Sequence, residues 1–191
     1  MATVDHAARR IQAKVVYWGP HGSGKTANLT YVLEKTRGGE TLPKRTPAPG
    51  EATYDVVPMT IGEIRGYSTH LALVAVSGHP SFGAHRLEQL ANVDGLVFVA
   101  DARAERAQAT LESLAELRAS LARHGFALER LPLVIQANLR DQPTSATAAA
   151  VATGLGLPNV RAFDAIAPRG VGVFDTLKAV TKLVLTELRK G

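Results

Sequence analysis

The chain has no cysteine, and aromatic residues make up only 5% of its 191 residues. The lack of cysteine excludes a disulfide-stabilised scaffold and any zinc or iron–sulfur site with thiolate ligands. No apolar stretch is long enough to cross a bilayer, and residues 1–13 lack the apolar core of a signal peptide. We therefore expect a cytoplasmic protein with no membrane-spanning segment.

Charge is modest and dispersed. The 22 basic and 17 acidic side chains leave a net charge of +5, and the basic residues are scattered along the sequence. Surfaces that bind nucleic acid concentrate Lys and Arg on one face, so we expect a mildly basic, solvated surface and no nucleic-acid partner. With 46% hydrophobic residues, the length fits a single globular domain spanning residues 1–191.

Short apolar runs alternate with segments of helical periodicity. Expected strands lie at 14–18, 52–64, 67–76, 96–101, 131–137 and 159–165. Expected helices lie at 27–35, 107–121 with Gly125 as a candidate C-cap, 144–153 and 173–189. The turn at Arg65-Gly66 joins two of these strands into a hairpin. The alternation predicts a three-layer α/β fold around a mostly parallel six-stranded sheet with one antiparallel strand.

Residues 19–26 read Gly-Pro-His-Gly-Ser-Gly-Lys-Thr and fit the phosphate-binding P-loop pattern G-x-x-x-x-G-K-[ST]. An apolar strand precedes the loop and a helix follows it, which is the context that the motif needs. Lys25 is expected to reach the β- and γ-phosphates, and the Thr26 hydroxyl to bind Mg²⁺. The expected nucleotide contacts in this segment are Gly19, His21, Gly22, Ser23, Gly24, Lys25, Thr26 and Ala27.

A second motif, Asn138-Leu139-Arg140-Asp141, follows the expected strand 131–137. Ligands of open α/β folds bind at this carboxyl edge of the sheet. The Asp141 carboxylate can accept both N1–H and N2–H of guanine, a donor pair that adenine lacks, while Asn138 can support the P-loop. After the last strand, a backbone N–H of Ala165 or Ile166 could donate to the guanine O6.

Together these segments resemble the Ras-like small GTPases, and among them the bacterial MglA-type polarity GTPases. The similarity runs nearly end to end and includes residues 15–20, 24–29, 55–58, 61–67, 93–101 and 172–178. The resemblance implies a Ras-like G domain that binds GTP and GDP with Mg²⁺ and switches between two states. It also implies a role in bacterial cell polarity or gliding motility, effector proteins, and a Roadblock-type (MglB-like) regulatory partner.

The chain departs from that family where a metal-bound water and the attacking water would be held. Ras-like proteins carry D-x-x-G after the second hairpin strand, and MglA-type proteins usually keep only the Gly and Gln of this region. Here the Asp position is Ala75. Gly78 is retained, and its N–H could sense a γ-phosphate. His79 stands where the family has a Gln that orients the attacking water, and an imidazole lacks the paired donor and acceptor of an amide.

The first switch also differs. The family places an Arg–Thr pair a few residues before the first hairpin strand, and ungapped alignment puts Gly50 and Glu51 there. Arg45 is the nearest candidate for an intrinsic arginine finger, and Thr53 the nearest candidate for the second Mg²⁺ ligand. In the base motif Leu139 replaces the usual Lys, while Asp141 is kept.

The sequence thus leaves three readings open. The first is a guanine-nucleotide switch whose hydrolysis is slow or depends on a partner. The second is a pseudo-GTPase, an interaction module that holds nucleotide or none without turning it over. The third is a P-loop protein that uses ATP, with Asp101 at the end of a buried strand as its Walker-B-like acid.

Overall fold

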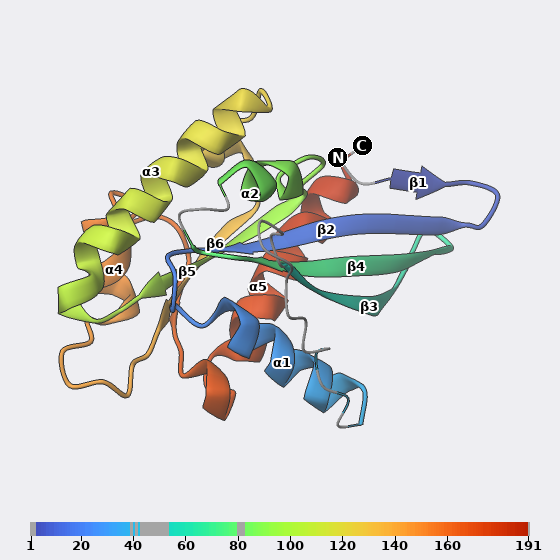
Figure 1. Cartoon of the computed structure of the whole chain (residues 1–191). Helices are drawn as coiled ribbons and strands as arrows, with labels where there is room; N and C mark the ends of the chain where they lie inside the picture. Colours follow the sequence, from blue (N-terminus) through green and yellow to red (C-terminus); the bar gives the residue numbers. More distant parts are fainter. Residues whose placement is uncertain (1–2, 39, 41, 43–53, 80–82, 191) are drawn as a thin grey trace.

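A computed structural model describes residues 3–38, 40, 42, 54–79 and 83–190 of the chain. Within them, a seven-stranded sheet in the order β3-β4-β2-β5-β6-β7, with β1 beside β2, is covered by helices on both faces (Figure 1). The strands are β1 (Thr3–Asp5), β2 (Arg10–Trp18), β3 (Tyr54–Ile64), β4 (Tyr67–Val76), β5 (Gly95–Asp101), β6 (Leu133–Asn138) and β7 (Ala162–Asp164). The helices are α1 (Lys25–Thr36), α2 (Gly83–Gln89), α3 (Ala107–Arg123), α4 (Ala148–Gly154) and α5 (Val173–Leu188).

The expectation of six strands was wrong by one. The additional strand, β1, pairs antiparallel with β2 through Thr3↔Gln12, Val4↔Ile11 and Asp5↔Arg10. All three of its residues are exposed, and three residues give no apolar alternation that a sequence pattern could reveal. The antiparallel pairing expected for the hairpin is confirmed in β3 and β4, and the remaining neighbours are parallel.

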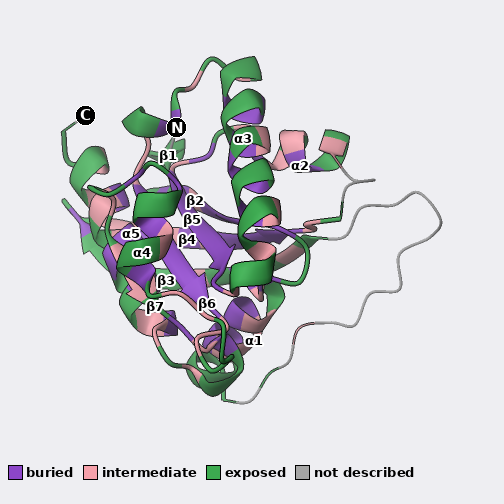
Figure 2. Cartoon of the chain, turned by 90° about the vertical axis from the view of Figure 1, so that its left-hand side faces the viewer, coloured by how far each residue is buried: buried purple, intermediate pink, exposed green. Residues whose placement is uncertain are grey.

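Alternating side chains of the strands build two cores, one on each side of the sheet. Val15 and Tyr17 of β2 face the side covered by α1 and α5. Val16 and Trp18 face the side covered by α2, α3 and α4. Figure 2 shows the strands buried between exposed helix surfaces. The α/β layering expected from the sequence is therefore confirmed.

The parallel strands end together at one edge of the sheet, and this sets the place of the site. Trp18 of β2 lies beside Phe98 of β5, and Asp101 at the end of β5 lies beside Asn138 at the end of β6. The loops that leave β2, β5 and β6 therefore meet at the carboxyl edge, where α/β proteins bind ligands. Among the helices that the structure describes, none is long and apolar enough to cross a membrane.

Candidate functional site

The loop between Trp18 and Lys25 has the backbone of a phosphate cradle. Its glycines adopt conformations with positive φ, +79° at Gly22 and +92° at Gly24, which favour glycine on steric grounds. At Gly24 a Cβ atom would lie 2.1 Å from the Asn138 side-chain nitrogen, so this position also needs glycine for space. Gly24 directly precedes α1, and the N–H groups at that helix end are available to an anion.

Side chains from other elements hold the loop by its carbonyl groups. Asn138 Nδ2 donates to the Ser23 carbonyl at 2.7 Å, and Asn28 Nδ2 donates to the Gly24 carbonyl at 3.0 Å. Asn28 in turn exchanges two amide hydrogen bonds, at 2.7 and 2.9 Å, with the fully buried Gln136 of β6. Because these amides are bonded, the loop is fixed in shape before any ligand arrives.

Lys25 is folded back onto the loop it belongs to. Its Nζ donates to the carbonyls of Gly19 and Pro20 at 2.8 and 2.7 Å, and the residue is 6% exposed. Burial, and to a smaller extent the nearby charge of Arg86, lowers the pKa of this ammonium to about 8. Phosphate oxygens would supply the negative charge that the buried ammonium lacks.

If Lys25 binds phosphate as expected, this pKa would make nucleotide affinity depend on pH. Phosphates favour the charged ammonium, so binding takes up a proton whenever Lys25 is neutral beforehand. With a pKa near 8 before binding, we expect GTP affinity to fall about eightfold between about pH 7.5 and 9. Titration of a fluorescent GTP analogue across this range measures the slope. Lys25→Arg is the control, because its guanidinium stays protonated, and equal slopes in both proteins would contradict the assignment.

Thr26 and Asp55 form a polar pair at the mouth of the loop. The Thr26 hydroxyl donates to the Asp55 carboxylate at 2.8 Å, and both residues line a cavity of about 340 Å³ together with loop residues. Asp55 lies opposite Ala75 in the β3–β4 ladder. Strand β3 therefore brings a carboxylate next to Ala75, the position at which Ras-like proteins carry the Asp of D-x-x-G. The sequence motifs gave no sign of this contact, since the two residues lie 29 positions apart.

The expected γ-phosphate sensor lies against the P-loop. A Cβ atom at Gly78 would approach the backbone nitrogen of His21 to 2.5 Å, so the two backbones are in close contact there. The exposed His79 ring lies edge-to-face with the His21 ring, with 5.9 Å between centroids. The structure thus brings Gly78, His79 and the loop together, and of the two imidazoles His21 lines the cavity.

Arg86 of α2 is a residue of this region that sequence reasoning missed. It is 4% exposed, and its guanidinium donates to the carbonyls of Ser77 and His79, to the Glu116 carboxylate of α3, and lies over the Trp18 ring. These contacts fix the backbone on both sides of Gly78. Arg86 belongs to no motif, and only the packing of α2 against β2 and α3 reveals its role.

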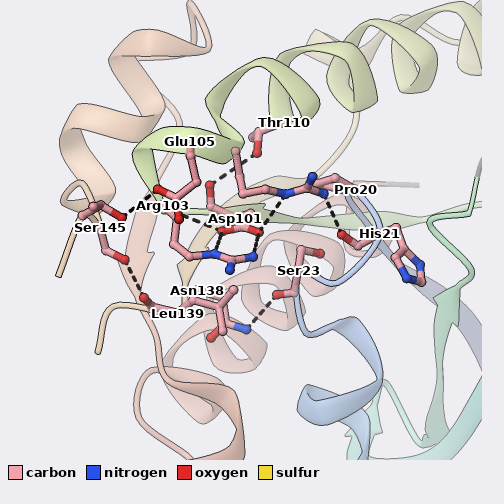
Figure 3. Close-up of polar contacts among 12 residues, drawn as sticks. Pro20, His21, Ser23, Asp101, Arg103, Glu105, Thr110, Asn138, Leu139 and Ser145 are labelled. Carbon is pink, nitrogen blue, oxygen red and sulfur yellow. Dashed lines mark hydrogen bonds and ion pairs between the residues drawn. The ribbon is translucent and has the colours of Figure 1, made fainter. Parts of the chain in front are cut away.

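The expected base-recognition motif is joined to the loop through Asn138. The Asn138 Nδ2 donates to the Ser23 carbonyl (Figure 3), and the Oδ1 of the same side chain accepts from the Ala167 N–H at 2.9 Å. Leu139 turns the chain with φ +65°, and Asp141 follows as an exposed residue on the surface. One buried amide therefore connects the phosphate loop, the N-x-x-D segment and the segment after β7.

The backbone around Ala165 is already bonded within the protein. The Ala165 N–H donates to the Ala137 carbonyl at 2.8 Å, and the Ile166 N–H donates to Val171 at 3.1 Å. A guanine O6 contact at Ile166 would therefore have to replace its bond to Val171. Ala27, in the first turn of α1, packs against the core beside α1 and α5.

Two expected site residues, Arg45 and Thr53, lie outside the described residues, as do Gly50 and Glu51. The described part of the site comprises a preformed phosphate loop, the Asp55 carboxylate bonded to Thr26, and the expected base motif, which Asn138 ties to the loop.

Comparison with known proteins places this site in context. No family model matches the chain. Over 194 aligned positions that cover 100% of both proteins, the chain is 44% identical to the mutual gliding-motility protein MglA of Myxococcus xanthus (strain DK1622).

Proposed function

The chain belongs to the MglA-type small GTPases, and on that premise we propose that it is a guanine-nucleotide switch that binds GTP and GDP. The observation that carries the proposal is Asn138, whose two side-chain hydrogen bonds, at 2.7 and 2.9 Å, join the P-loop to the base side of the site. A P-loop alone fits many nucleotides. Coupled to Asp141, it fits guanine.

Each part of the nucleotide has a group suited to it. The inward N–H groups of the loop and Lys25 would hold the phosphates, and Asp141 would accept from guanine N1 and N2. The Thr26 hydroxyl and the Asp55 carboxylate offer oxygen ligands of the kind that Mg²⁺ takes, directly or through water. We propose these two residues for the metal, with Asp55 supplying the carboxylate that Ala75 cannot.

The ATP alternative loses its main support. A Walker-B-like Asp must lie near the metal-binding hydroxyl, but the Asp101 carboxylate is paired with Arg103 at 2.7 Å and Arg106 at 3.5 Å. The Thr26 hydroxyl is bonded to Asp55 instead.

The pseudo-GTPase is the second candidate, because Ala75 and His79 replace groups that Ras-like GTPases use to hydrolyse GTP.

By its family, the chain is suited to a role in bacterial cell polarity or gliding motility. We include in the proposal effector proteins and a Roadblock-type partner.

Hydrolysis by the chain alone should be slow. An arginine finger contributes about 10³–10⁵ in rate, and the usual Gln is replaced by His79. Restoring that amide with His79→Gln should leave turnover far below finger-assisted rates, because an amide cannot replace the charge of a guanidinium. Single-turnover GTP hydrolysis is measured for both proteins with Mg²⁺, with and without a Roadblock-type protein.

The outcomes separate the candidates. Acceleration by the partner supports the switch, and slow turnover in every condition with nucleotide still bound supports the pseudo-GTPase. Fast turnover by the unaltered chain alone would show that one of its own arginines fills the finger role. The expectation of slow hydrolysis, which rests on the absent Arg and Gln of the family, would then fail.

A further inference from the structure

The shape of the phosphate loop leaves its carbonyl groups in need of donors. A loop that turns its N–H groups toward phosphate turns carbonyls outward, where they need partners of their own. Lys25, Asn138 and Asn28 bond four of these carbonyls. The His21 carbonyl is bonded differently, by the guanidinium of Arg106, whose Nη2 donates to it at 3.1 Å.

Arg106 comes from a separate part of the chain, 85 positions from His21. It ends the short 3-10 helix Ala104–Arg106, which follows β5 directly. Its Nε lies 3.5 Å from Oδ2 of Asp101, so one guanidinium spans the end of β5 and the P-loop. Arg106 is 35% exposed at the side chain, and the Asp101 side chain is 0% exposed.

Asp101 is held firmly enough to orient this contact. Arg103 binds it with two parallel hydrogen bonds, Nε to Oδ1 at 2.9 Å and Nη2 to Oδ2 at 2.7 Å. The hydroxyl of Thr110 donates to the Asp101 backbone carbonyl at 3.3 Å (Figure 3). A buried carboxylate bonded by two arginine side chains is fixed in position. Among the hydrogen bonds of the described residues, Arg106 bonds the P-loop at His21, and Arg103 bonds Asp101.

A cation on the His21 carbonyl affects the loop in two ways. It restrains the backbone at the middle of the loop, where His21 is otherwise exposed. It also polarises the peptide between His21 and Gly22, which makes the N–H on the other end of that peptide a stronger donor. Lys25 must leave the carbonyls of Gly19 and Pro20 to reach a phosphate, whereas Arg106 binds from outside and can stay.

We propose that Arg106, oriented by Asp101, is a positioning residue that fixes and polarises the P-loop at His21 and so slows the release of bound nucleotide. The inference rests on the proposed function, because it concerns the same nucleotide site. It adds to that function a residue outside the P-loop and base motifs. It also gives Asp101 a role in binding through Arg106 rather than as a metal ligand.

The test compares two arginines that share one partner. Dissociation of a fluorescent GDP analogue is followed with Mg²⁺ and excess unlabelled GDP for the unaltered chain, Arg106→Gln and Arg103→Gln. Because a hydrogen bond to a charged group is among the stronger ones, we expect Arg106→Gln to release the analogue about tenfold faster. Arg103→Gln removes a partner of Asp101 but leaves the Arg106 contact with His21 in place, so it should accelerate release clearly less than Arg106→Gln does.

Arg106→Lys guards against a folding defect. It keeps a positive charge beside Asp101, but a single ammonium lacks the fork that contacts Asp101 and His21 together. Its release rate should lie between those of the unaltered chain and Arg106→Gln. The ratio of guanine to xanthine affinity should be unchanged in all variants, since the base site is untouched, whereas general loosening of the fold would alter it.

Equal rates for Arg106→Gln and the unaltered chain, or equal acceleration in Arg103→Gln, would overturn the inference while the proposed function stands. If the unaltered chain bound no guanine nucleotide, the proposed function would fail first, and the role of Arg106 with it.

Discussion

Lys25→Ala should lose nearly all affinity for GTP. In the present structure the Lys25 ammonium is bonded to the carbonyls of Gly19 and Pro20 and is ready to exchange these for phosphate oxygens. Alanine removes two or more hydrogen bonds from a charged donor, each about 1.5–3 kcal/mol, so we expect affinity to fall about 100-fold or more. Equilibrium titration of a fluorescent GTP analogue with Mg²⁺ measures the change.

Lys35→Ala is the matched control. Lys35 lies on the same helix, but its side chain is 49% exposed and pairs with Glu34, away from the loop. Its removal should leave GTP affinity unchanged. Unchanged affinity in Lys25→Ala as well would overturn the assignment of residues 19–26 as the phosphate site.

Asp141→Asn should change which base the protein prefers. The carboxylate accepts from guanine N1–H and N2–H, whereas an Asn amide donates its N–H where the N2–H donor would lie. The guanine N2–H donor then faces the amide N–H donor, and no hydrogen bond can form. Xanthine has an oxygen at that position, which can accept from the amide. We expect GTP affinity to fall about 100-fold, from the loss of two charge-assisted hydrogen bonds, and xanthosine triphosphate to become the better ligand.

Competition between GTP and xanthosine triphosphate for the fluorescent analogue measures this preference. Asp175→Asn is the control, because it neutralises another exposed carboxylate, in the first turn of α5. An unaltered preference in Asp141→Asn would remove the base motif from the account and return the ATP alternative.

Local motifs were predictable from the sequence because each is contiguous. Strand, loop and helix follow one another in residues 10–36, so the pattern of residues 19–26 carries its own structural context. The positions of most strands along the chain and the antiparallel hairpin also follow from local patterns. The short strand β1 was not predictable from the sequence, because its pairing to β2 depends on backbone hydrogen bonds and not on apolar side chains.

The support of the P-loop by Asn138 was predicted from its motif, but other contacts between distant residues were not predictable. Asp55 meets Thr26, Arg86 meets Ser77 and His79, and Arg106 meets His21 only once the sheet and its helices are assembled. Single charged residues carry no periodic signal, so one chain alone does not show which of its 22 basic residues is buried in a site. The site therefore holds more groups than its motifs name.

The most direct test of the central claim lets the unaltered chain choose its nucleotide. The purified protein is incubated with equal amounts of GTP and ATP and with Mg²⁺, freed of unbound nucleotide, and denatured, and the released nucleotide is identified by chromatography. The account predicts GTP or GDP, about one per chain, with little adenine nucleotide. Adenine nucleotide in equal or larger amount, or no retained nucleotide, would contradict it.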